Sequence, residues 1–109
     1  MDIAKMQQEA WQTSEDHGFH NGPEQLNIPT KLMLIACEVA EVMEEYRKPN
    51  WRSWYLNENG KPEGVAAELA DIIIRVGDLA GILRINLDLA VREKMAYNKT
   101  REHMHGKTI

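Results

Sequence analysis

Residues 64–83 read GVAAELADIIIRVGDLAGIL, and this stretch decides the fold class. Between Leu69 and Leu79 it is apolar on nearly every side, interrupted only by Asp71, Arg75 and Asp78. A helix that is apolar all round is normally buried by several neighbouring helices or by a second chain. The stretch therefore predicts a helical protein in which residues 64–83 form a heavily packed element.

Three more helices are predicted around this stretch, with two loops between them. Long runs without Gly or Pro, and a single Phe, favour helix packing over a β-sandwich. The expected helices cover residues 2–17, 30–48 (capped by Thr30) and 87–102, and the expected loops cover 18–29 and 49–63. We therefore expect one all-α, four-helix bundle-like domain over residues 1–109, oligomeric because so short a chain closes only a modest core.

The overall charge and the single cysteine limit the possible partners and compartment. A net charge of −4 disfavours nonspecific nucleic-acid binding, which needs a basic face to displace counterions. The lone Cys37 excludes an intramolecular disulfide and fits a reducing compartment. No apolar run approaches the roughly 18 residues of a membrane span, and no signal-peptide pattern is present, so we expect a cytoplasmic protein.

Two carboxylate pairs at helical spacing indicate a metal site. Glu38-Val-Ala-Glu41 and Glu68-Leu-Ala-Asp71 each place two acids on one side of a helix. In both helices the acids border the apolar stripe, whereas acids normally lie opposite it. Two such rows repel each other unless a cation lies between them, and all-carboxylate ligation favours a hard cation such as Mg²⁺ or Mn²⁺.

Two other interpretations of these acids stay open, and a third is disfavoured. The acids can form a solvated helix face, or Arg75 can neutralise one of them, although a single arginine cannot balance four carboxylates. A diiron site is disfavoured, because that class uses Glu-x-x-His on two helices and the only such spacing here is Glu102/His105.

The order of these motifs resembles a known family. ExxE, a gap of 26 residues and ExxD is the signature spacing of the all-α nucleoside triphosphate pyrophosphatases, the MazG-like group. The segments KLMLIACEVAEVMEEYRK (31–48) and ELADIIIRVGDLAGILRINLDLAVREKMAYNKTR (68–101) are similar to that family's metal-binding helix and the helix pair after it. The resemblance covers roughly residues 30 to 107 and implies a MazG-type fold with paired subunits.

The resemblance also implies roles for the acids. Glu38, Glu41, Glu68 and Asp71 would ligate Mg²⁺, which would activate a water for attack on the α-phosphorus of a nucleoside triphosphate. Glu38 and Glu41 are the catalytic candidates, with Glu41 as the predicted base. Glu44 points about 60° or more away from the other acids, so it is left outside the site.

A basic row on the fourth helix is the candidate phosphate clamp. Lys94, Asn98 and Arg101 recur at spacings of four and three and share one face, which is either solvated or binds the triphosphate. Arg75 either contacts a phosphate or orients Asp71. His105 and Lys107 are further candidates at the end of the chain.

Three residues in the loops are candidates for contact with the base. Trp51 and Trp54 can stack on it, or else pack against the helices or a second chain. His20 can reach a base edge.

The predicted function is Mg²⁺-dependent hydrolysis of (deoxy)nucleoside triphosphates to a monophosphate and pyrophosphate by a homodimer or a dimer of dimers. One alternative is a phosphoribosyl-ATP pyrophosphohydrolase on a related fold. The other is a non-enzymatic helical interaction module, whose acids pair with the basic helix of another subunit.

Overall fold

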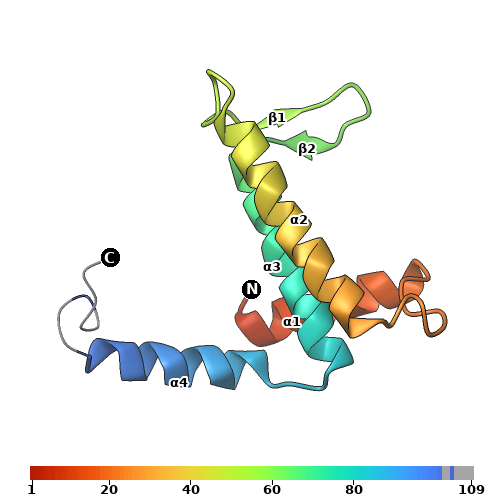
Figure 1. Ribbon diagram of the computed structural model, residues 1–109, viewed down its shortest axis with the longest axis vertical. Coiled ribbons are helices and arrows are strands. Elements are labelled where there is room, and N and C mark those ends of the chain that lie inside the picture. Colours follow the sequence, from red (N-terminus) through yellow and green to blue (C-terminus); the bar gives the residue numbers. More distant parts are fainter. Residues whose placement is uncertain (102–103, 105–109) are drawn as a thin grey trace.

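The structure, a computed structural model, describes residues 1–101 and 104. Most of them are helical, which confirms the all-α prediction. In chain order the elements are α1 (Ile3–Asp16), α2 (Ile28–Tyr46), β1 (Tyr55–Leu56), β2 (Pro62–Glu63), α3 (Val65–Ile82) and α4 (Leu87–Lys99) (Figure 1).

Side-chain caps fix the starts of three helices. Asp2, Asn27 and Asn86 each accept a hydrogen bond from the backbone N–H three residues ahead, which satisfies a donor that the first turn leaves free. The prediction that Thr30 caps the second helix is wrong. The helix starts earlier because Pro29 fits its first turn, where a missing N–H costs nothing. The predicted fourth helix is too long at its end. It stops at Lys99, with Thr100 as its C-cap, so Arg101 lies beyond the helix.

Helix α3 is the centre of the packing. Helices α1 and α2 both pack on it, with α2 alongside and α1 across its C-terminal half (Figure 1). Close approach to α1 depends on two glycines of α3. A Cβ on Gly77 would lie 2.7 Å from Met6 Sδ, and one on Gly81 would lie 2.9 Å from Trp11 Cβ. A side chain at Gly81 would therefore push α1 away from α3, whereas one at Gly77 would displace the flexible end of Met6.

Helix α4 leaves this three-helix packing and extends away from the α2–α3 pair (Figure 1). Its principal helix contact is with α1. The Gln7 amide holds the junction, because it donates to the Ile85 carbonyl at 2.8 Å and accepts from the Leu87 N–H at 3.3 Å. The four helices of one chain thus do not surround a common core.

The sequence predicted a loop over residues 49–63, but this segment also contains regular structure. It contains an antiparallel pair of two-residue strands, with Tyr55 opposite Glu63 and Leu56 opposite Pro62. A turn that contains Asn59 and Gly60 closes the pair, and the Gly60 N–H donates to the Asn57 carbonyl at 2.9 Å. The side-chain oxygen of Asn57 accepts from the N–H groups of Asn59 and Lys61.

Helices α2 and α3 bury acidic residues and expose large apolar ones, whereas an ordinary helical protein does the reverse. Only four apolar residues are buried among those described, namely Ala10, Ala67, Leu79 and Ala80, whereas Glu38 and Glu68 are 7% and 6% exposed. Several large apolar residues of these helices are exposed instead. Val39 and Ile73 are each 54% exposed, and Leu32, Met43 and Leu69 are comparable, whereas Ile35, Val42, Ile72 and Val76 are half-buried. In this single chain, acids occupy part of the helix interface, and an exposed apolar stripe on each of the two helices lacks cover. No helix within 1–101 is both long and apolar enough to cross a membrane.

Candidate metal and phosphate site

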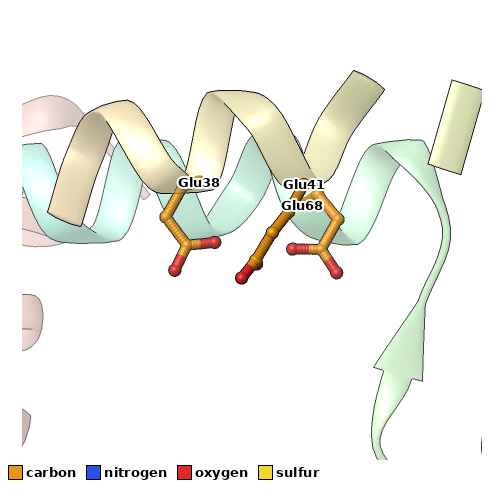
Figure 2. A group of neighbouring side chains, drawn as sticks. All are labelled: Glu38, Glu41 and Glu68. Carbon is orange, nitrogen blue, oxygen red and sulfur yellow. The ribbon is translucent and has the colours of Figure 1, made fainter. Parts of the chain in front are cut away.

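The α2–α3 interface brings acids from both predicted pairs together. Carboxylate oxygens of Glu38, Glu41 and Glu68 lie within 4.8 Å of one another (Figure 2). Two of these side chains come from successive turns of α2, and Glu68 faces them from the first turn of α3. Asp71, one turn further along α3, lines the same cavity. The spacing argument therefore identified side chains that meet in space.

The acids carry more negative charge than their protein neighbours neutralise. The Arg75 guanidinium donates from Nε to Glu38 Oε1 at 2.8 Å. The other oxygen of Glu38 and Oε2 of Glu68 are buried, with no hydrogen-bond partner among the described residues. A buried carboxylate oxygen without a partner is costly. The donor set thus fits a hard divalent cation, which would satisfy both oxygens at once.

The pKa values of two acids are raised because carboxylates lie close together in this partly buried place. Burial, a hydrogen bond with Glu41 and the charges of Asp71, Glu41 and Glu38 raise the pKa of Glu68 to about 7. Burial and the charge of Glu38 raise the pKa of Asp71, although Lys61 and Arg75 oppose the shift. A bound cation favours the charged form of both groups, so cation binding would displace the Glu68 proton near neutral pH.

A cavity of about 400 Å³ opens at these acids and also carries cationic groups. Lys31, Lys61 and Arg75 line it together with Glu38, Glu41 and Asp71. The Lys31 ammonium lies 4.0 Å from Asp78 Oδ2 and donates to the Phe19 carbonyl at 3.3 Å. Acids beside amines and a guanidinium form the mixed surface on which a metal and a phosphate chain bind together.

A second acidic group lies beside the first and has protein partners of its own. Glu45, Glu63 and Glu68 also offer oxygens within 4.8 Å of one another. Here, however, the Lys48 ammonium is 3.0 Å from Glu45, and the Asn57 amide donates to Glu63 at 3.2 Å. This group is therefore better satisfied by the chain itself than the group at Glu38.

Glu44 lies where the sequence analysis placed it, outside the site. Its side chain is exposed and pairs with Arg47 at 3.4 Å on the surface of α2. It is therefore a matched control for substitutions of the buried acids on the same helix.

The predicted clamp on α4 is not brought to the acids within one chain. None of Lys94, Asn98 and Arg101 lines the cavity in the described part of the chain. Instead, Lys94 and Arg101 each lie 5.6 Å from the ring centroid of Tyr97. Asn98 Oδ1 is buried and has no partner within residues 1–101. His105 and Lys107 lie outside the described residues.

The three predicted base-binding residues also lie away from the cavity lining, as far as the chain is described. His20 is buried, with Nδ1 2.6 Å from Glu15 and Nε2 2.8 Å from Asp78, so it ties the first loop to α1 and α3. Trp51 packs edge-on against Tyr46 at 4.9 Å. Trp54 is 60% exposed on the approach to β1.

Six lining residues were not among the sequence candidates for this site: Ser14, Phe19, Lys31, Lys61, Ile74 and Asp78. Three of them carried a usable signal. Lys31 precedes Glu38 by seven residues, and Asp78 follows Asp71 by seven, so each shares a helix face with an identified acid. Phe19 is the chain's only Phe and lies in a polar loop, where a large apolar side chain needs a reason. Lys61 gave no comparable signal, because its position depends on the β1–β2 turn.

Comparisons with family models, with curated proteins and with solved structures gave no match. The family resemblance therefore remains an interpretation of motif spacing. The site's chemistry has to be argued from its own residues.

Proposed function

We propose that this protein is a Mg²⁺-dependent nucleotide pyrophosphohydrolase of the MazG-like type, which cleaves (deoxy)nucleoside triphosphates to a monophosphate and pyrophosphate. One observation carries the proposal. Acids from two helices converge at a cavity that also holds Lys31, Lys61 and Arg75, and buried oxygens of Glu38 and Glu68 have no partner in the described chain. This is the arrangement that a metal-bound phosphate chain requires.

Glu38, Glu41, Glu68 and Asp71 are the residues that would hold Mg²⁺, with Mn²⁺ as a substitute. When bound, the ion supplies charge neutralisation at the phosphates and lowers the pKa of a coordinated water. Neutralisation matters here because burial and neighbouring carboxylates raise the pKa of Glu68 to about 7. The cavity is therefore poorly suited to a polyanion until a cation is present.

Side chains of the protein bind the phosphates, accept the proton of the water and orient the metal ligands. Lys31, Lys61 and Arg75 bind and orient phosphate oxygens from the cavity wall. Glu41 is the exposed member of the converging acids, so its carboxylate can reach a water at the cavity mouth and accept its proton. Arg75, through its 2.8 Å hydrogen bond, also fixes the orientation of the Glu38 carboxylate.

A second copy of the chain completes the site in this proposal. Lys94 and Asn98 lie on α4, which extends away from the α2–α3 pair, and Arg101 follows just after the end of that helix. The exposed stripes at Val39 and Ile73 lie on the helices that hold the acids. Burying these stripes against a partner gives a homodimer, or a dimer of dimers, in which the partner's α4 can supply the clamp.

The function is tested by incubating a panel of nucleoside triphosphates with Mg²⁺ and measuring pyrophosphate and orthophosphate separately. Pyrophosphate and monophosphate in equal amounts are expected from at least one nucleotide. Orthophosphate alone contradicts cleavage between the α- and β-phosphates.

Absence of any product, together with a melting temperature indifferent to Mg²⁺, favours the interaction module instead. In that case the buried acids at Glu38 and Glu68 would serve only to pair with a basic helix of another subunit.

A further inference from the structure

A second cavity, of about 250 Å³, adjoins the acidic one between α1 and α3. It is lined by Ala10, Thr13, Ser14, His17, Phe19 and Ile74. Three of these residues, Ser14, Phe19 and Ile74, also line the acidic cavity. The two cavities are therefore neighbours, one lined by charged groups and the other mainly by apolar groups.

Phe19 lies at the boundary and is held there although its ring is open to solvent. The side chain is 58% exposed. Its backbone carbonyl accepts from the Lys31 ammonium at 3.3 Å, and the same ammonium lies 5.9 Å from the ring centroid. The next residue, His20, is fixed between Glu15 and Asp78. An exposed aromatic ring on an anchored backbone is a ready stacking surface.

We propose that this second cavity binds the nucleobase of the nucleotide, with the base stacked on Phe19 and packed against Ile74. Thr13 and Ser14 also line this cavity, and their hydroxyl groups are the kind of donors and acceptors that a polar base edge would use. The proposal rests on the proposed function, since the acidic cavity must hold the phosphates. A flat, mostly apolar ring with polar edges matches this lining better than a second phosphate group does.

The alternative stacking surface for the base is the segment that contains Trp51 and Trp54, here called the tryptophan segment. Trp51 is already packed against Tyr46 and lies 4.5 Å from the Arg52 guanidinium. Trp54 is open, but it does not line either cavity as far as residues 1–101 define them. Phe19 is the aromatic residue that the two cavities share, and the base is therefore assigned to it.

The test compares two probes that differ only in the presence of a nucleoside. Dissociation constants are measured with Mg²⁺ for a cleavage-resistant nucleoside triphosphate analogue and for inorganic triphosphate. The Phe19→Ala variant is expected to bind the nucleotide about 10-fold more weakly and to bind inorganic triphosphate as the native protein does. Phe19→Trp is expected to keep nucleotide binding, because it keeps a stacking face. Leu26→Ala, in the same loop, serves as the control.

Each other outcome overturns the inference in a distinguishable way. Equal weakening for both probes would mean that Phe19 shapes the whole site. A loss confined to Trp54→Ala would transfer the base to the tryptophan segment. Unchanged affinities, with Phe19→Ala converting an oligomer to a monomer by light scattering, would make the ring a subunit contact. If the native protein binds neither probe, the proposed function itself fails.

Discussion

The α2–α3 pair and helix α4 represent opposite arrangements of charge. On α2 and α3 the acids Glu38 and Glu68 are buried, whereas apolar residues such as Val39 and Ile73 are about half exposed. On α4 no residue is buried as a whole, and Lys94, together with Arg101 just beyond the helix, lies near the exposed ring of Tyr97. One region gathers negative charge in a helix interface, and the other presents Lys94 and Arg101 away from the acidic cavity. This difference is the basis of the proposal that the two halves of the site come from different copies of the chain.

The largest expected effect comes from removing one buried acid. Glu68→Gln should lower the hydrolysis rate by more than about 100-fold, because even partners that only support a metal ligand are worth 10- to 100-fold. The same change should raise the melting temperature without metal, since it removes a crowded buried carboxylate, and abolish the further rise on adding Mg²⁺. Glu44→Gln should change neither property. Retention of the Mg²⁺-induced shift in Glu68→Gln would contradict metal binding by this acid.

The next effect concerns the apolar side of the same helices. Ile73→Asp should weaken subunit association by more than about 100-fold, because a charge buried in an apolar interface costs several kcal/mol. Light scattering across a concentration series measures it, with Leu26→Asp as a control that adds the same charge in a loop. If Ile73→Asp has the native oligomeric mass, the exposed stripe of α3 is not the subunit interface.

A smaller effect on catalysis is expected from a substitution on α4, and it tests whether α4 and the acids of one site come from different chains. Lys94→Ala should raise KM about 10-fold, because it deletes one charge-assisted hydrogen bond to phosphate. Mixing Lys94→Ala with Glu38→Gln should give more activity than the average of the two variants, since a mixed dimer contains one site with both native residues. Activity at or below the average would place the clamp and the acids in one chain.

The smallest effect is a pH dependence. The pKa of Glu68 is raised to about 7, above its ordinary value of 4.5, so the folded metal-free protein holds a proton that the unfolded chain has lost. Stability should therefore fall as pH rises from about 4.5 to 7 and then level off. Mg²⁺ affinity should rise up to about 10-fold per pH unit below 7 for the same reason. Thermal melts and titration calorimetry at matched pH measure both trends, and Glu68→Gln should flatten them.

Most of the helical structure could be predicted from the sequence, because helix periodicity and caps are local signals. The ends of α3 fall within a residue of the predicted Gly64 and Leu83. The β1–β2 pair could not be predicted, since two-residue strands carry no alternating pattern. The loop composition of residues 18–29 predicts a helix start at Thr30, but proline is favoured in a first turn, so α2 begins at Ile28 with Asn27 as its cap.

The acids were predictable for the same local reason, and the surroundings of the site were not. Spacing places Glu38 beside Glu41 on a face of α2, whatever the fold. It does not say which neighbouring sector of that helix meets α3, so the outward apolar stripe at Val39 was not foreseen. Nor does the spacing of Lys94 and Arg101 report how far α4 lies from the acids.

The central claim is that water attacks the α-phosphorus of a nucleoside triphosphate. The most direct test is to let the protein hydrolyse a nucleotide that it accepts, with Mg²⁺ present, in water enriched in heavy oxygen. Mass spectrometry of the products then identifies the phosphorus that the water attacked. Attack of water on the α-phosphorus, as proposed, predicts one heavy oxygen in the nucleoside monophosphate and none in the pyrophosphate. Heavy oxygen in pyrophosphate or orthophosphate, with none in the monophosphate, would contradict the proposed reaction.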